Sequence, residues 1–171
     1  RRYSVRLMAV KILPPRTDVT AVLSAHIKRN VKSWHRYVVA KPTTYEEFSQ
    51  WKIPHKNLPV PPSADTISLP DGGDAVPLQT AKNLLGASRV TNACVYSPMG
   101  GMFWHTNSNF EGTRLYYTFG LDRSVFKYKD PHTGEEHESW DAVGWTCRTF
   151  DIPEDKPLWH SVWTSGRRFS F

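Results

Sequence analysis

The chain has 171 residues, a length that suits a single domain with its own hydrophobic core. Its hydrophobic fraction of 39% and charged fraction of 22% are ordinary for a soluble globular protein, and no apolar run approaches the roughly 20 residues that span a bilayer, so no membrane association is expected. The formal net charge of +6 favours anionic partners, namely nucleic acid, an acidic small molecule or an acidic protein surface.

Residues 1–52 are predicted to hold one strand and two helices that pack on the rest of the domain. Residues 1–13 alternate between apolar and polar and then become apolar before two prolines, a pattern typical of a strand. Apolar residues at helical spacing follow from 17 to 34. Residues 43–51 begin with two threonines followed by two glutamates, which resembles a capping box and predicts a short helix.

Residues 53–83 form a proline-rich connecting segment. Six prolines between Pro54 and Pro77 exclude a helix over most of this stretch, because proline lacks the backbone donor that a helix needs. We interpret the segment as a linker or a surface wrap, with a short helix near 80–85 at its end.

Residues 84–171 are predicted to form the core of the domain as a series of short strands. The expected strands cover 89–96, 102–105, 114–121, 125–128, 145–150, 158–163 and 168–171. Closely spaced short strands with Gly, Pro and Asp turns indicate an antiparallel sandwich or barrel. The predicted fold is therefore α+β and predominantly β, a jelly roll with the N-terminal helices bracing one face. Since the chain stops at Phe171 within an apparent strand, we expect the natural protein to extend beyond one or both ends.

The two cysteines, Cys94 and Cys147, lie in strand-like runs and form no CxxC pair. A disulfide framework is not indicated, and buried free thiols are expected. This cysteine usage fits a cytoplasmic protein.

Residues 132–138 concentrate two histidines and three glutamates after an Asp-Pro turn. A surface metal is one interpretation. Because Asp-Pro-x-Thr-Gly is typical turn chemistry, we expect a solvated hairpin tip instead.

Two other histidines, His105 and His160, each follow a tryptophan in a strand-like run, and we expect them to meet across the barrel. On a strand, residues i and i+2 point to the same side, so Asn107 is expected to present its amide beside His105. Two histidines and one carboxylate on the same face are typical of a mononuclear non-haem iron site, and here Asn107 takes the position of the carboxylate. Arg167 and Arg168 follow, and a planar guanidinium grips a carboxylate with two hydrogen bonds.

At these residues the chain resembles the iron(II)- and 2-oxoglutarate-dependent oxygenases, whose fold is a double-stranded β-helix. The resemblance covers about residues 89–171. It rests on an ordered set of a strand that ends at Tyr96, the triplet 105–107, His160, and Arg168-Phe169-Ser170. Asn107 stands where the family pattern has an aspartate.

The resemblance implies Fe(II) and 2-oxoglutarate as cofactors. It assigns the metal to His105, Asn107 and His160. It assigns the keto acid to Arg168 or Arg167, together with Tyr96 or Tyr117. It also implies an oxygenase that hydroxylates or otherwise oxidises an unknown substrate while 2-oxoglutarate is converted to succinate.

The residues leave a second interpretation open. His105 and His160 are also explained as hydrogen-bonded core residues of a β-domain. The protein is then a non-catalytic jelly-roll module, with a structural, assembly or binding role, that has lost the metal carboxylate. The basic charge leaves a nucleic acid or another anionic substrate open for the first interpretation, and self-assembly for the second.

Overall fold

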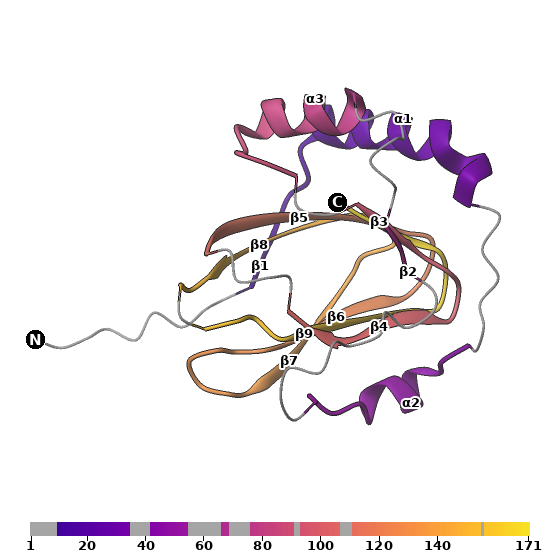
Figure 1. The fold of residues 1–171 in the computed structure, drawn as a ribbon. Coiled ribbons are helices and arrows are strands. Elements are labelled where there is room, and N and C mark those ends of the chain that lie inside the picture. The colour runs from indigo at the N-terminus through magenta and orange to yellow at the C-terminus, as the bar shows by residue number, and fades with distance from the viewer. Residues whose placement is uncertain are drawn as a thin grey trace, which may run out of the picture.

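The computed structural model describes residues 10–34, 42–54, 66–68, 76–90, 93–106, 111–154 and 156–171. The described parts contain three helices and ten strands (Figure 1). In chain order these are β1 (Lys11–Leu13), α1 (Thr17–Trp34), α2 (Tyr45–Ser49), β2 (Thr66–Ser68), α3 (Val76–Leu85), β3 (Cys94–Tyr96), β4 (Gly100–His105), β5 (Gly112–Gly120), β6 (Ser124–Lys129), β7 (Glu136–Trp140), β8 (Gly144–Ile152), β9 (His160–Thr164) and β10 (Arg168–Ser170).

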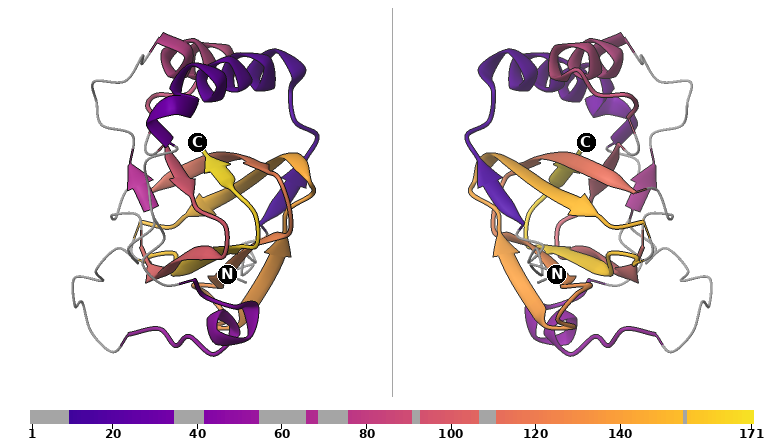
Figure 2. Two further views of the ribbon diagram at one scale, coloured as in Figure 1. Left: turned by 90° about the vertical axis from the view of Figure 1, so that its right-hand side faces the viewer. Right: turned by 90° about the vertical axis from the view of Figure 1, so that its left-hand side faces the viewer.

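The strands form two antiparallel sheets that lie one above the other (Figures 1 and 2). One sheet has the order β1-β8-β5-β10-β3-β2, and the other has the order β4-β9-β6-β7. The last two strands of the chain are inserted between earlier ones, since β9 pairs with β4 and β6 while β10 pairs with β3 and β5. The prediction of a predominantly β, α+β fold is confirmed.

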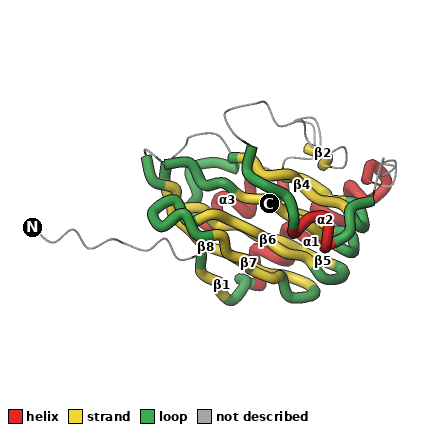
Figure 3. The backbone as a smooth tube through the Cα atoms, turned by 90° about the horizontal axis from the view of Figure 1, so that it is seen from below, coloured by secondary structure: helices red, strands yellow, loops and turns green. Residues whose placement is uncertain are grey.

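The helices cover both sheets. Helices α1 and α3 lie over the outer face of the six-stranded sheet, whereas α2 lies beneath the four-stranded sheet (Figures 1 and 3). The prediction that the N-terminal helices brace one face is therefore wrong for α2. Phe48 of this helix is fully buried against Val125 and Trp163, which point outward from the four-stranded sheet, and this contact holds α2 on that side.

Two helix starts follow from local chemistry. The predicted capping box of α2 is confirmed: the Glu47 backbone N–H donates to the Thr44 side chain, and the Thr44 backbone N–H donates to the Glu47 carboxylate. Helix α3 begins at Val76, earlier than predicted, because Pro77 lies in the first turn, where a helix needs no backbone donor.

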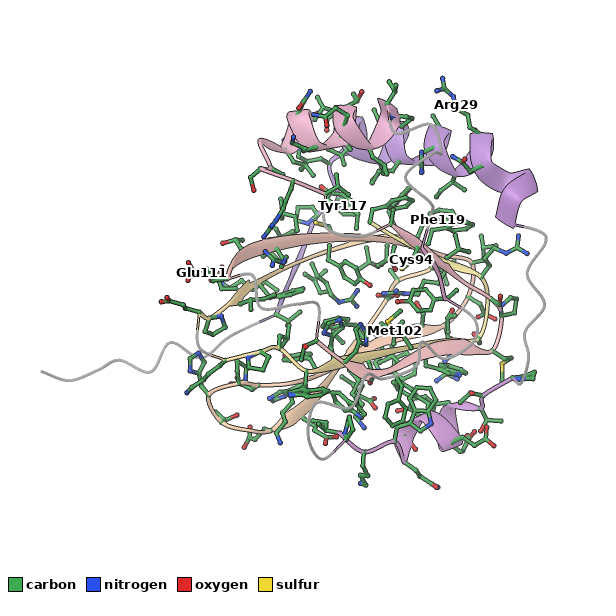
Figure 4. The ribbon with its side chains drawn as sticks, in the orientation of Figure 1. Arg29, Cys94, Met102, Glu111, Tyr117 and Phe119 are labelled. Atoms are coloured by element: carbon green, nitrogen blue, oxygen red, sulfur yellow. The ribbon has the colours of Figure 1, made fainter. Side chains whose placement is uncertain are left out.

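Strand alternation divides the side chains between two packing layers. Between the sheets lies an apolar cluster that includes Cys94, Tyr96, Phe126, Phe150 and Val162, with Met102 and Tyr116 packed against it. Between the six-stranded sheet and the helices lies a second cluster that includes Val19, Leu23, Ala81, Tyr117 and Cys147. Figure 4 shows the division: Tyr117 and Phe119 point from the sheet toward the helices, while Cys94 and Met102 lie between the sheets.

Cys94 and Cys147 are free and buried, as predicted. Residues 132–138 lie in and beside the β6–β7 hairpin, and His132 at its turn is exposed, so the hairpin is confirmed. Among the described helices, none combines the length and hydropathy that crossing a membrane requires. Strands β1 and β2 come from the predicted N-terminal and connecting segments, and both join the six-stranded sheet.

Candidate metal centre

The structure brings His105 and His160 into direct contact. His105 ends β4, His160 begins β9, and the two residues are partners in the β4–β9 pairing. Their ring centroids are 4.1 Å apart, with an angle of 57° between the ring planes. His160 is buried, with 6% of its surface exposed, and His105 is half-buried.

A register shift in β4 aims the His105 ring into the space between the sheets. Three steps along β4, from Met102 to His105, face only two steps along β9, as in a β-bulge. On a regular strand these two residues would point to opposite faces. The shift instead sends Phe103 and Trp104 outward together. The Phe103 ring lies 5.1 Å from that of Trp51, and the Trp104 indole donates to the Trp51 carbonyl over 3.0 Å.

The hydrogen bonds of the two rings fix where their protons lie. His105 Nδ1 is 2.7 Å from the Phe103 carbonyl oxygen, and His160 Nδ1 is 3.0 Å from the Leu158 carbonyl oxygen. Because a carbonyl only accepts, each Nδ1 carries the proton and each Nε2 carries a lone pair. Within the described ranges, neither Nε2 has a hydrogen-bond partner. This is the arrangement of metal-binding histidines, whose second nitrogen is anchored to a carbonyl or carboxylate.

Both rings are held in the neutral form that a metal requires. Burial lowers the pKa of His105 below its usual range. Burial lowers the pKa of His160 further, and the neighbouring charge of a protonated His105 adds to the effect. Metal ions compete with protons for imidazole nitrogens, so a depressed pKa keeps these lone pairs available at neutral pH.

A buried arginine lies in the same interior. Arg168 points inward from β10, and its Nε donates to Asp141 over 2.7 Å. Its Nη1 donates to the Ser170 hydroxyl over 2.6 Å and lies 3.4 Å from the Tyr116 hydroxyl. Its Nη2 is buried and has no hydrogen-bond partner among the residues that the structure describes. A buried, unpaired guanidinium nitrogen is costly and marks a place where an acceptor fits.

Asp141 is shared by two arginines. Its carboxylate accepts from Arg168, from Arg148 and from the Ser124 hydroxyl. Burial would raise the pKa of Asp141, but the two guanidinium charges outweigh burial and hold it at about 2. Two arginines and one carboxylate, all with side chains at most 1% exposed, carry a net charge of +1. An anion is the natural complement of such a buried excess charge.

One aromatic ring, Phe126, contacts both Arg148 and His160. Phe126 stacks on His160 at 5.4 Å between ring centroids, and the Arg148 guanidinium lies 5.8 Å from the centre of the same Phe126 ring. The charge of Arg168 also contributes to lowering the pKa of His160. The candidate metal ligands and the excess positive charge therefore face one shared interior.

The residues predicted to bind the keto acid are not all placed at this interior. Tyr96 lies there, with its ring centre 5.3 Å from the Arg168 guanidinium. Tyr117 does not, because it points to the opposite face of β5 and packs under the helices. Its neighbour Tyr116 faces Arg168 instead, with its ring centre 5.5 Å from the guanidinium. Arg167 is half-exposed and lies before β10, outside the hydrogen bonds of Asp141.

Sequence reasoning did not assign Tyr116 or Arg148 to this interior, and it weighed Asp141 only as one of several carboxylates without ligand spacing. The period of two along β5 would have found Tyr116 once the inward face was known. Asp141 and Arg148 gave no spacing signal, because Asp141 follows β7 and Arg148 lies on β8, in different sheets.

The third predicted metal ligand, Asn107, lies outside the described residues. In the ranges that the structure does describe, no group of three or more His, Cys, Asp or Glu side chains is arranged to hold a metal. The described donor set therefore consists of two neutral imidazoles. Comparison of the sequence with protein-family models finds no match, and comparison with curated proteins finds none either.

Proposed function

We propose that the protein is an iron(II)- and 2-oxoglutarate-dependent oxygenase that oxidises a substrate not yet identified. The observation that carries this proposal is the contact between His105 and His160, with both Nδ1 atoms anchored to carbonyls and both Nε2 atoms without a hydrogen-bond partner among the described residues. Imidazole nitrogens suit Fe(II), and two histidines with a third ligand leave positions for a co-substrate and oxygen.

The strand order supports the finer proposal that the fold is a double-stranded β-helix. In each sheet a C-terminal strand is inserted between two earlier ones, β9 between β4 and β6, and β10 between β3 and β5. This insertion is what brings His160 to His105 and Arg168 to Tyr96.

The buried excess charge supports 2-oxoglutarate as the co-substrate. Arg168 Nη2 has N–H groups to donate, and Ser170 and Tyr116 place hydroxyls beside the same guanidinium. A carboxylate bound here would take up the net +1 charge of the Arg148–Asp141–Arg168 group. Arg168 would bind the distal carboxylate of the keto acid, and His105 and His160 would hold the metal.

The chain's own residues would bind and orient the metal and the keto acid, and would exclude water from them. His105 and His160 would hold the metal, with Asn107 as the third contact predicted from the sequence. Met102, Phe126, Phe150 and Leu158 give the interior apolar walls, which favours charge interactions inside it. When bound, the metal and keto acid would supply the oxidising power from O₂, with release of succinate and CO₂.

Anaerobic titration with Fe(II) and 2-oxoglutarate tests the proposal. A visible charge-transfer band is expected at one equivalent of each, and it should be absent in His160→Ala. His132→Ala is the matched control, because His132 is exposed in the β6–β7 turn and should leave the band unchanged. A wild-type protein with no band, or a band that survives His160→Ala, contradicts the proposal.

A second candidate function is a non-catalytic jelly-roll module with a structural, assembly or binding role. It is favoured by the pairing of Arg168 with Asp141, since this internal salt bridge gives the arginine a structural role without a co-substrate. The same titration, together with a measurement of oligomeric state, separates the two candidate functions. The absence of metal binding together with stoichiometric self-association would support the non-catalytic module.

A further inference from the structure

A cavity lies on the other face of β5, between the six-stranded sheet and α3. Its volume is about 460 Å³, which falls within the range of small-molecule sites. Leu78 and Leu85 of α3 line one side, and Leu115 and Tyr117 of β5 line the other. Tyr117 belongs to this cavity while Tyr116 faces Arg168, so the sheet itself separates it from the candidate metal centre.

The end of α3 builds the rim of the cavity. The Gly86 N–H donates to the Asn83 carbonyl, and the Ala87 N–H donates to the Lys82 carbonyl. Gly86 has a φ of +63°, a left-handed conformation that glycine adopts without strain. This turn carries residues 87–90 along the cavity, where they form part of its lining.

The cavity exposes apolar side chains to solvent. Leu115 is 39% exposed and Val90 is 43% exposed, and both line the cavity. Covering this apolar surface would be favourable. A ligand with an apolar body would cover them.

The rim of the cavity is basic. Its lining includes the basic residues Lys82, Arg89 and Arg114, and Glu111 is the one acidic residue among the described residues that line it. Arg89 and Arg114 come from different parts of the chain. Partial burial lowers the pKa of Arg114, and the nearby charge of Arg89 lowers it further. Both arginines line the same cavity as Leu115 and Val90, so this cavity combines a basic rim with an apolar wall.

We propose that this cavity binds a small organic anion that has an apolar or aromatic body and one acidic group. The apolar body would contact Leu78, Leu115 and Val90, while the acidic group would meet Arg89 and Arg114. The two parts of the cavity thus select for the two parts of the ligand. This inference does not depend on the proposed oxygenase function.

The probe 8-anilinonaphthalene-1-sulfonate tests the proposal, because it joins aromatic rings to one sulfonate. N-phenyl-1-naphthylamine, which has the rings without the charge, is the matched probe. The wild-type protein should bind the sulfonate at one saturable site and the uncharged probe more weakly. The double variant Arg89→Gln, Arg114→Gln should weaken sulfonate binding by about tenfold, the loss expected for charge-assisted hydrogen bonds, and leave the uncharged probe unchanged.

Two controls fix the location of the probe. Arg29→Gln removes a cation that projects from α1 away from the sheet (Figure 4), so sulfonate binding should stay the same. Leu115→Ser should weaken both probes. Unchanged binding of both probes in Leu115→Ser would overturn the inference. Equal affinity of wild type and the double arginine variant, equal affinity for both probes, or no saturable binding would also overturn it.

Discussion

Arg148 crosses the space between the two sheets to reach Asp141. Arg148 lies on β8 of the six-stranded sheet, whereas Asp141 directly follows β7 of the four-stranded sheet. Arg148 also donates to the Ser139 hydroxyl over 2.9 Å and to the Ser139 carbonyl over 2.8 Å. Since Asp141 binds Arg168 as well, the same carboxylate ties the sheets together and holds the arginine of the proposed co-substrate site.

Asp141→Asn should destabilise the fold strongly. The substitution leaves two buried guanidinium groups without a counter-charge, and breaking a buried pair in this way typically costs about 3–5 kcal/mol. Urea denaturation should show this loss in the free energy of unfolding. Asp151→Asn makes the same chemical change at an exposed position and should cost less than about 1 kcal/mol. Similar losses for the two variants would mean that Asp141 does not hold the arginines together.

The acid sensitivity of the fold should also depend on Asp141. Its pKa is about 2 in the folded protein and near the ordinary value of 3.8 in the unfolded chain. A lowered folded pKa gives stability that is complete above the unfolded value and is lost as pH falls through the folded one. The free energy of unfolding of the wild type should therefore fall between about pH 4 and 2. In that window Asp141→Asn should show a smaller decline, and an equal decline would contradict the pairing.

In the metal-free protein, the buried histidines should make stability fall below about pH 6.5. Both folded pKa values are lowered, so the unfolded chain takes up protons that the buried rings do not. Each histidine contributes at most about 1.4 kcal/mol per pH unit to this slope. Denaturation from pH 7.5 to 5 should show a shallower slope for His160→Gln than for the wild type. His132→Gln makes the same substitution at an exposed turn and is the matched control.

Two adjacent tyrosines offer a matched test of the co-substrate site. Tyr116→Phe removes the hydroxyl beside Arg168 Nη1 and Ser170 and should raise the Kd for 2-oxoglutarate about three- to tenfold, the value of one hydrogen bond. Tyr117→Phe alters the other face of β5 and should leave that Kd unchanged. Isothermal titration with Fe(II) present measures both. A larger effect from Tyr117→Phe would place the keto acid elsewhere.

Asn107→Asp should raise the affinity for Fe(II) by about tenfold or more, because a carboxylate adds a full negative charge to the ligand set and tenfold corresponds to about 1.4 kcal/mol. Anaerobic competition with a metal indicator measures the change. Asn83→Asp, on the exposed surface of α3, is the matched control and should have no effect. Unchanged affinity in Asn107→Asp would remove this residue from the proposed ligand set.

The sequence alone determined the local features of this protein. Alternation and turn residues predicted the strand-rich half of the chain, and Thr44 with Glu47 predicted the start of α2. These features depend on residues close together in the chain, so they can be predicted from short stretches of the sequence. The meeting of His105 and His160 was also expected, and the two rings are in contact.

The tertiary structure decided which side chains share the interior. A one-residue shift in register moves every side chain of a strand to the other face, so sequence could not choose between Tyr116 and Tyr117. The shift between Met102 and His105 depends on the pairing of β4 with β9. The Arg148–Asp141 pair joins two sheets. The side of the domain that α2 covers depends on the contact of Phe48 with Val125 and Trp163. Each of these is set by contacts between distant segments, which exist only after the sheets have formed.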